Sequence, residues 1–169
     1  MRIAVSGSHH VGKSTLVDSV AEALPGYTTV EEPYYLLEEE GYESADPPSQ
    51  EDFEAQFERS LEAIEEGGRS VLFDRCPADV LAYLSTLDPE LDIAPAMEQV
   101  REAMRTLDFV VFVPIEDRVA LPEHEDADYR RAVNERLREL LEELDVEVVT
   151  VAGDVRTRVD LVLARIGTR

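Results

Sequence analysis

Eight consecutive residues near the amino terminus, GSHHVGKS from Gly7 to Ser14, have the types and spacing that phosphate binding requires. They fit the pattern G-x-x-x-x-G-K-S/T, whose glycines let successive backbone N–H groups turn inward toward an anion. In such a loop the Lys13 ammonium reaches the β- and γ-phosphates, and the Ser14 hydroxyl binds Mg²⁺. Lys13 is the only lysine of the chain. A compact ammonium suits a position among phosphate oxygens better than an arginine fork does.

The residues on either side of this loop indicate a strand before it and a helix after it. RIAVS, residues 2–6, is a short apolar run, and apolar residues recur at helical spacing over 13–24. The helix would point the positive end of its dipole at the same anion. We therefore expect the loop to bind ATP, with GTP as an alternative, together with Mg²⁺. The residues expected to contact the nucleotide here are Gly7, Ser8, His10, Val11, Gly12, Lys13, Ser14 and Thr15.

The rest of the chain alternates strand-like and helix-like segments. Further strands are expected over 27–32, 70–74, 108–115 and 146–151. Helical patterns lie over 33–37, over 49–68 with Ser49 as N-cap, and over 77–87, 93–107, 129–144 and 154–166. This alternation favours an α/β fold in which helices cover both faces of a parallel sheet. No internal repeat or second domain is evident, so residues 1–169 are expected to form one domain.

Composition narrows the range of partners. The chain has 38 Asp and Glu against 16 Lys and Arg, a net charge of −22, which repels nucleic acid and anionic membranes. No apolar run approaches the length of a membrane span, and the N-terminus turns polar too early for a signal peptide, so a cytoplasmic location is expected. Cys76, the only cysteine, is expected to be an inert small side chain. The oligomeric state stays open, a homodimer included.

The residues after the apolar strands bear on the type of reaction. A GTP switch of the Ras type reads guanine with Asn-Lys-x-Asp, and this chain has no second lysine for that motif. An ATPase motor usually ends a strand with Asp-Glu, whose glutamate orients the attacking water. Here the strand SVLFD is followed by Arg75 after Asp74. A positive charge at that position weighs against fast hydrolysis and favours transfer to a bound acceptor.

Three motifs together resemble a known family. They are the phosphate loop, Glu32-Pro33 after the second strand, and Asp74-Arg75 after the third. The chain resembles the P-loop nucleoside and nucleotide kinases, and its short length is most similar to ribosylnicotinamide kinase domains and the related small AAA domain proteins. The resemblance implies a three-layer P-loop fold with strand order 2-3-1-4-5 and a short lid. It also implies transfer of a γ-phosphoryl group to a small acceptor.

The chemistry of the two acid-containing motifs agrees with that reaction. A sugar hydroxyl that attacks the γ-phosphate must lose a proton, and a nearby carboxylate can accept it. Glu32 is the first candidate, with Glu31 and Asp74 behind it. Asp74 could instead orient the water bound to Mg²⁺, and Arg75 would neutralise charge on the transferring group. The alternative is that these residues are only surface acids and an ion pair at the end of a strand.

The lid and the acceptor pocket are less clearly marked in the sequence. The resemblance implies a lid over about 115–131, whose arginines cover the phosphates, with Arg130 favoured over Arg118 and Arg131. All three could equally pair with neighbouring glutamates. The residues that could recognise the acceptor are Glu31, Tyr34, Tyr35, Phe53 and Gln56. Phe53 and Gln56, however, share a helical spacing with Phe57 and Leu61 that also suits core packing. Near the donor adenine the resemblance implies Gly153 and Arg156.

Three functions therefore remain open. The first is an ATP- and Mg²⁺-dependent kinase that phosphorylates a small nucleoside-like molecule. The second is a regulatory or assembly ATPase, stimulated by a protein partner rather than by a metabolite. The third is a nucleotide-binding module without turnover.

Overall fold

The computed structural model describes residues 1–116 and 126–167, and five parallel strands form its central sheet. The strands are β1 (Arg2–Ser6), β2 (Thr28–Val30), β3 (Val71–Asp74), β4 (Phe109–Phe112) and β5 (Val148–Thr150). Their order in the sheet is β2-β3-β1-β4-β5, and each neighbouring pair is parallel. The expected α/β fold and strand order are confirmed.

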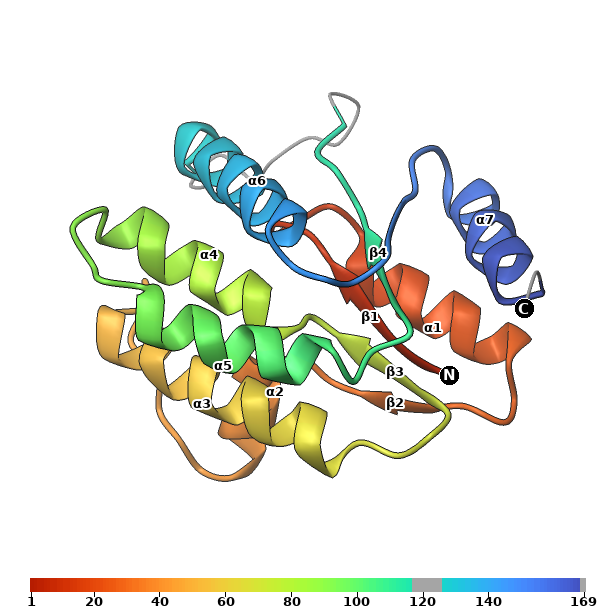
Figure 1. Ribbon diagram of the computed structural model, residues 1–169, viewed down its shortest axis with the longest axis horizontal. Helices are drawn as coiled ribbons and strands as arrows, with labels where there is room; N and C mark the ends of the chain where they lie inside the picture. Colours follow the sequence, from red (N-terminus) through yellow and green to blue (C-terminus); the bar gives the residue numbers. More distant parts are fainter. Residues whose placement is uncertain (117–125, 168–169) are drawn as a thin grey trace.

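Helices cover both faces of the sheet (Figure 1). One face carries α1 (Lys13–Ala23) and α7 (Val155–Gly167). The other carries α3 (Gln50–Glu66), α4 (Pro77–Leu87), α5 (Ala94–Met104) and α6 (Ala127–Glu142), and α2 (Pro33–Glu39) packs against α3. Because side chains alternate along a strand, Ile3 and Val5 pack toward α1 and α7, whereas Ala4 packs toward the other layer.

Local sequence signals account for where several elements begin and end. Ser49 caps α3, since its hydroxyl accepts the Asp52 N–H at 3.3 Å while the Asp52 carboxylate accepts the Ser49 N–H at 2.7 Å. Prolines stand in the first turns of α2, α4 and α5, where their fixed φ suits a helix. The strand expected to reach residue 115 ends at Phe112, because Pro114 has no N–H for a further ladder bond.

The parallel arrangement brings three loops to one edge of the sheet. The loop after β1, Glu32 after β2, and Arg75 after β3 all follow the carboxyl ends of neighbouring strands. Most of the expected lid, including Arg118, lies outside the described residues. Within 1–116 and 126–167, no helix combines the length and the apolar character needed to cross a bilayer.

Candidate functional site

The loop from Gly7 to Gly12 can take its shape only with glycine at both ends. Gly7 has φ 153°, and a Cβ there would lie 2.5 Å from the carbonyl oxygen of Val113. Gly12 has φ 87°, a left-handed conformation, and α1 begins at the next residue. The first turn of α1, whose N–H groups have no carbonyl partner within the helix, therefore faces this loop with its positive dipole end.

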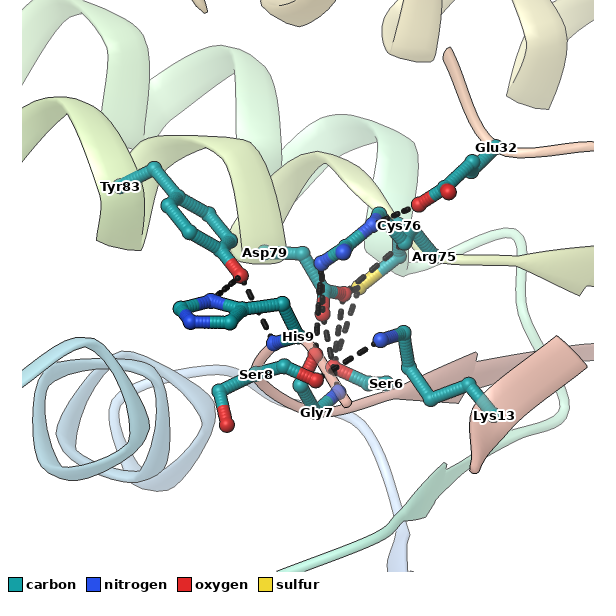
Figure 2. A network of polar contacts seen from close by, with 10 residues as sticks. All are labelled: Ser6, Gly7, Ser8, His9, Lys13, Glu32, Arg75, Cys76, Asp79 and Tyr83. Atoms are coloured by element: carbon teal, nitrogen blue, oxygen red, sulfur yellow. Dashed lines mark hydrogen bonds and ion pairs between the residues drawn. The ribbon is translucent and has the colours of Figure 1, made fainter. Parts of the chain in front are cut away.

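Lys13 extends into this loop as a buried cation. Its side chain is 5% exposed, and its Nζ donates a hydrogen bond to the Ser8 carbonyl oxygen at 2.8 Å (Figure 2). Burial lowers the pKa of Lys13 to about 8, with the Arg75 charge acting in the same direction and the carboxylates of Asp79, Glu32 and Asp74 opposing it. Near neutral pH the group is largely an ammonium, ready to pair with an anion.

Ser14 and Asp74 offer oxygen atoms side by side. The Ser14 side chain lies beside the Asp74 carboxylate, which is buried at the end of β3. One Asp74 oxygen, Oδ1, is buried with no hydrogen-bond partner among the described residues. Burial raises the pKa of Asp74 against the lowering effects of Ser14 and Lys13. A hard cation such as Mg²⁺, which prefers few protein oxygens plus phosphates and water, fits this pair.

Arg75 occupies a strained and partly buried position. Its φ is 80°, which costs a non-glycine residue about 1–3 kcal/mol and is typical of functional sites. Its Nε donates to the Glu32 carboxylate, and its Nη1 donates to the Gly7 carbonyl oxygen at 3.3 Å. Burial acts to raise the pKa of Glu32, but the charge and hydrogen bond of Arg75 bring it below its usual value. Glu32 and Arg75 thus form a pair next to the loop.

Asp79 is a site residue that the sequence analysis missed. It is fully buried in the first turn of α4, and its Oδ1 accepts the Gly7 N–H at 2.9 Å. Its Oδ2 accepts the Ser6 hydroxyl at 2.7 Å and the Cys76 N–H at 3.0 Å (Figure 2). Burial raises the pKa of the Cys76 thiol well above its usual range, as does Asp79, so the thiol stays protonated. The signal that could have found it is an acid three residues after the N-cap Cys76, with Pro77 in the first turn, which is the spacing of a capping box.

Beside the Glu32–Arg75 pair lies a cavity of about 520 Å³, called here the aromatic pocket. Its walls include Glu32, Arg75 and the expected acceptor residues Tyr34, Phe53 and Gln56. The remaining lining residues are His9, Asp46, Pro47, Pro48, Val80, Tyr83, Asp126 and Tyr129. Tyr83 and Tyr129 were not expected there, since each reads in the sequence as part of an apolar helix face.

The other two expected acceptor residues lie elsewhere. Tyr35, 48% exposed, and Glu31 line a smaller hollow of about 160 Å³, together with Ser14 and Asp74. The expected acceptor set is therefore divided between two sides of Glu32, which borders both hollows. A third hollow, about 680 Å³ between α3 and α5, contains none of the expected residues and is bordered by Arg2 at the start of β1.

An arginine from the carboxyl-terminal half of the chain donates hydrogen bonds to the backbone of the phosphate loop. Arg130, buried in the first turn of α6, donates from Nε to the His9 carbonyl oxygen and from Nη2 to that of His10, both at 3.0 Å. Arg131 is exposed and pairs with Asp128 on its own helix. Of the expected lid arginines, Arg130 is thus the one that the described structure brings to the loop.

Near the expected adenine site, Arg158 rather than Arg156 is turned inward. Arg156 is exposed, whereas Arg158 is buried, donates to the Val11 carbonyl oxygen at 2.7 Å and pairs with Glu116. The Gly153 N–H donates to the Glu116 carboxylate at 3.2 Å. The helical stripe of α7, with Arg158 four residues before the buried Val162, is the signal that would have found it.

Comparison with solved structures shows the same fold in several kinases. Deoxyadenosine kinase from M. mycoides with bound dATP aligns at 17% identity and TM-score 0.68 over 99% of both chains. NadR in complex with NAD and AMP-PNP aligns at 22% identity and TM-score 0.73, over 99% of this chain and 49% of NadR. Shikimate kinase from Aquifex aeolicus aligns at 18% identity and TM-score 0.65, over 99% and 97%. At these identities the likeness establishes the fold.

The sequence also matches a family described as an AAA domain. Among curated proteins, none matches the chain. The family match spans residues 2–158, which include the phosphate loop, the Glu32–Arg75 pair and Arg158. The resemblance to small AAA domain proteins seen in the three motifs is thereby confirmed. Because the match covers nearly the whole chain, we conclude that the protein belongs to this AAA domain family.

Proposed function

We propose that the protein transfers the γ-phosphoryl group of ATP to a hydroxyl of a small nucleoside-like acceptor. One observation carries the proposal above all others. Glu32 and Arg75, paired at the carboxyl edge of the sheet, stand between the phosphate loop and the aromatic pocket. A γ-phosphate over Lys13 and a hydroxyl in that pocket would therefore meet at a carboxylate and a guanidinium.

In this reaction each described residue has a defined part. The acceptor oxygen forms a bond to the γ-phosphorus while the bond to the β,γ-bridging oxygen breaks, and ADP leaves. Glu32 accepts the proton that the hydroxyl loses, and Arg75 stabilises the charge on the transferring oxygens. Lys13 and the N–H groups of the loop hold the β- and γ-phosphates.

Ser14 and Asp74 are the residues that would hold magnesium. When bound, the ion would neutralise charge on the β- and γ-phosphate oxygens. The fit rests on the buried Asp74 Oδ1 without a hydrogen-bond partner in the described part of the chain, and on the Ser14 hydroxyl beside it. Arg158 and Gly153, next to Val11 and Glu116, would border the donor base, with Arg156 at the exposed rim.

The charge of the aromatic pocket supports an acceptor that carries no phosphate of its own. The acids Glu32, Asp46 and Asp126 line it, and the Arg75 guanidinium is already paired with Glu32. A second phosphate would meet net negative charge there. The rings of Tyr34 and Phe53 offer faces for stacking on a planar base, and Gln56 offers an amide for its edge.

The proposal treats residues 1–169 as one domain with a lid over about 115–131. Arg130 belongs to the carboxyl-terminal end of that lid and already contacts the loop carbonyls of His9 and His10. Closure of the lid with Arg118 and Arg130 over the phosphates would exclude water and favour the acceptor over hydrolysis.

An ADP-release assay across a panel of acceptors tests this function. Mg-ATP is supplied with nucleosides, ribosylnicotinamide, nucleoside monophosphates or shikimate, and GTP replaces ATP in a parallel series. At least one nucleoside or ribosylnicotinamide should stimulate ADP release well above the rate with ATP alone. Stimulation by none of these acceptors, or by monophosphates only, would contradict the proposal.

A further inference from the structure

Tyr83 lies where the phosphate loop meets the aromatic pocket, and the proposed transfer gives it no part. It is 8% exposed and stands on α4 one turn after Asp79. Its phenol oxygen accepts the His9 N–H at 2.9 Å and lies 3.0 Å from His9 Nδ1. In Figure 2 the hydroxyl points at the loop, and the ring lies beside the Arg75 guanidinium.

The ring of Tyr83 is held by the residues of the pocket itself. Phe53 stacks on it nearly parallel, with centroids 5.3 Å apart and planes inclined by 14°. The ring of Tyr129 is tilted against it at 6.3 Å, and the Cζ atom of Arg75 lies 5.3 Å from its centroid. A tyrosine side chain is rigid beyond its two torsions, so its hydroxyl cannot shift without the ring. A displacement of the ring therefore also displaces the hydroxyl that accepts the His9 N–H.

Asp79 provides a useful contrast on the same helix. It also holds the loop, at Gly7, but it is fully buried and does not line the aromatic pocket. Its side chain does not border the pocket, although its Oδ1 lies 3.8 Å from Nη1 of the pocket residue Arg75. Tyr83 holds the loop two residues further on and has its ring in the pocket wall.

We propose that Tyr83 is a positioning residue that makes the shape of the phosphate loop depend on the occupant of the aromatic pocket. Its hydroxyl holds the His9 N–H, and its ring, between Phe53 and Arg75, meets a planar occupant. Occupation of the pocket and binding of the nucleotide then strengthen each other. Only the identity of the occupant, a nucleoside, rests on the proposed function.

The test compares Tyr83→Phe, which keeps the ring and removes the hydroxyl, with Tyr27→Phe as matched control. Tyr27 is a partly buried tyrosine whose hydroxyl contacts the amino terminus of the chain. Calorimetry measures the affinity for Mg-AMP-PNP alone, with saturating adenosine and with saturating ribosylnicotinamide. Hydrogen exchange measures protection of the loop amides, and thermal unfolding shows whether each variant stays folded.

In Tyr83→Phe the affinity for Mg-AMP-PNP should fall about 5- to 20-fold, as expected for one hydrogen bond in a buried site, and the loop amides should exchange faster. In the unmutated protein one of the nucleosides should raise the affinity for Mg-AMP-PNP about 5-fold or more. In Tyr83→Phe the affinities with and without that nucleoside should be nearly equal. Tyr27→Phe should change neither quantity.

Two results in the Tyr83→Phe variant would overturn the proposal. One is wild-type affinity and loop exchange in Tyr83→Phe; the other is weaker binding with the nucleoside effect intact, which a merely structural residue would give. If neither nucleoside alters AMP-PNP affinity in the unmutated protein, dependence on the pocket is refuted, while transfer in the ADP-release assay would still uphold the proposed function. Loss of both loop protection and nucleoside coupling in Tyr83→Phe supports the proposal even if no phosphate is transferred.

Discussion

At the scale of single residues, the site depends on one buried ammonium. Lys13 is the only lysine, and it is held between the Ser8 carbonyl and three carboxylates although burial lowers its pKa to about 8. Removing a charged donor to phosphate oxygens costs about 1.5–3 kcal/mol for each hydrogen bond lost. Lys13→Ala should therefore weaken Mg-ATP about 100-fold or more in calorimetry.

The exposed Glu22 lies on the same helix and supplies a control for this change. Glu22→Ala should bind Mg-ATP as the unmutated protein does. Retained affinity in a folded Lys13→Ala protein would refute the assignment of the phosphate loop.

A second prediction at this scale concerns Glu32. If Glu32 takes the proton from the hydroxyl of the small-molecule substrate, Glu32→Gln should lower kcat about 100-fold or more while the affinity for Mg-ATP changes little. The amide still hydrogen bonds to Arg75, so the loop geometry is kept. Glu39→Gln, an exposed acid on α2, serves as the control in steady-state kinetics. A kcat unchanged in Glu32→Gln would contradict this role and leave Glu31 or Asp74 as the base.

At the scale of elements, the sequence predicted the alternation of strands and helices but not what α4 does. Apolar runs and glycine or proline boundaries located the strands and the loop after β1, whereas the strand order came from the family resemblance. In PADVLAYLSTL, however, Asp79 and Tyr83 fall within an apolar helix pattern. Their contacts to Gly7 and His9 come from packing across the sheet edge, which periodicity does not contain. For Arg158 the spacing of four residues to Val162 on α7 indicates burial, but its contact to the Val11 carbonyl oxygen again comes from packing.

The capping box of α3 gives a stability prediction. Ser49→Ala removes the side-chain cap and should cost about 1 kcal/mol. For a chain of this size that lowers the unfolding midpoint by about 2–4 °C in a thermal melt. Ser49→Asp keeps an accepting oxygen and should lose less, although it adds charge near Asp52. No difference between the two variants would mean that the cap contributes little.

Lowering the pH should destabilise the N-terminus of the same helix, α3. Hydrogen bonds from Ser49, then others from Tyr42 and Ala45, hold the pKa of Asp52 below its ordinary value of 3.8. A carboxyl with a lowered folded pKa stabilises fully above its unfolded pKa and loses that contribution as pH falls through the folded value. Denaturant melts at falling pH should therefore show a smaller stability loss in Asp52→Asn than in the unmutated chain. An equal loss of unfolding free energy in the two proteins as the pH falls would contradict this prediction.

At the scale of the whole molecule, the net charge of −22 opposes both folding and nucleotide capture. Like charges on the surface repel one another, and salt screens them over a Debye length of about 10 Å at 0.1 M. Adding NaCl from low to near-molar concentration should raise the unfolding midpoint and speed association of Mg-ATP in stopped-flow experiments. Sucrose, which does not screen charge, serves as the control for association, and slower association in salt would contradict the prediction.

The most direct measurement for the account as a whole is the fate of the γ-phosphate. The protein is incubated with γ-labelled Mg-ATP and either nucleosides or ribosylnicotinamide, and the products are separated and identified by mass. The account predicts a monophosphorylated acceptor formed together with an equal amount of ADP, and none with Lys13→Ala. Label released only as inorganic phosphate, at the same rate with and without acceptor, would contradict it.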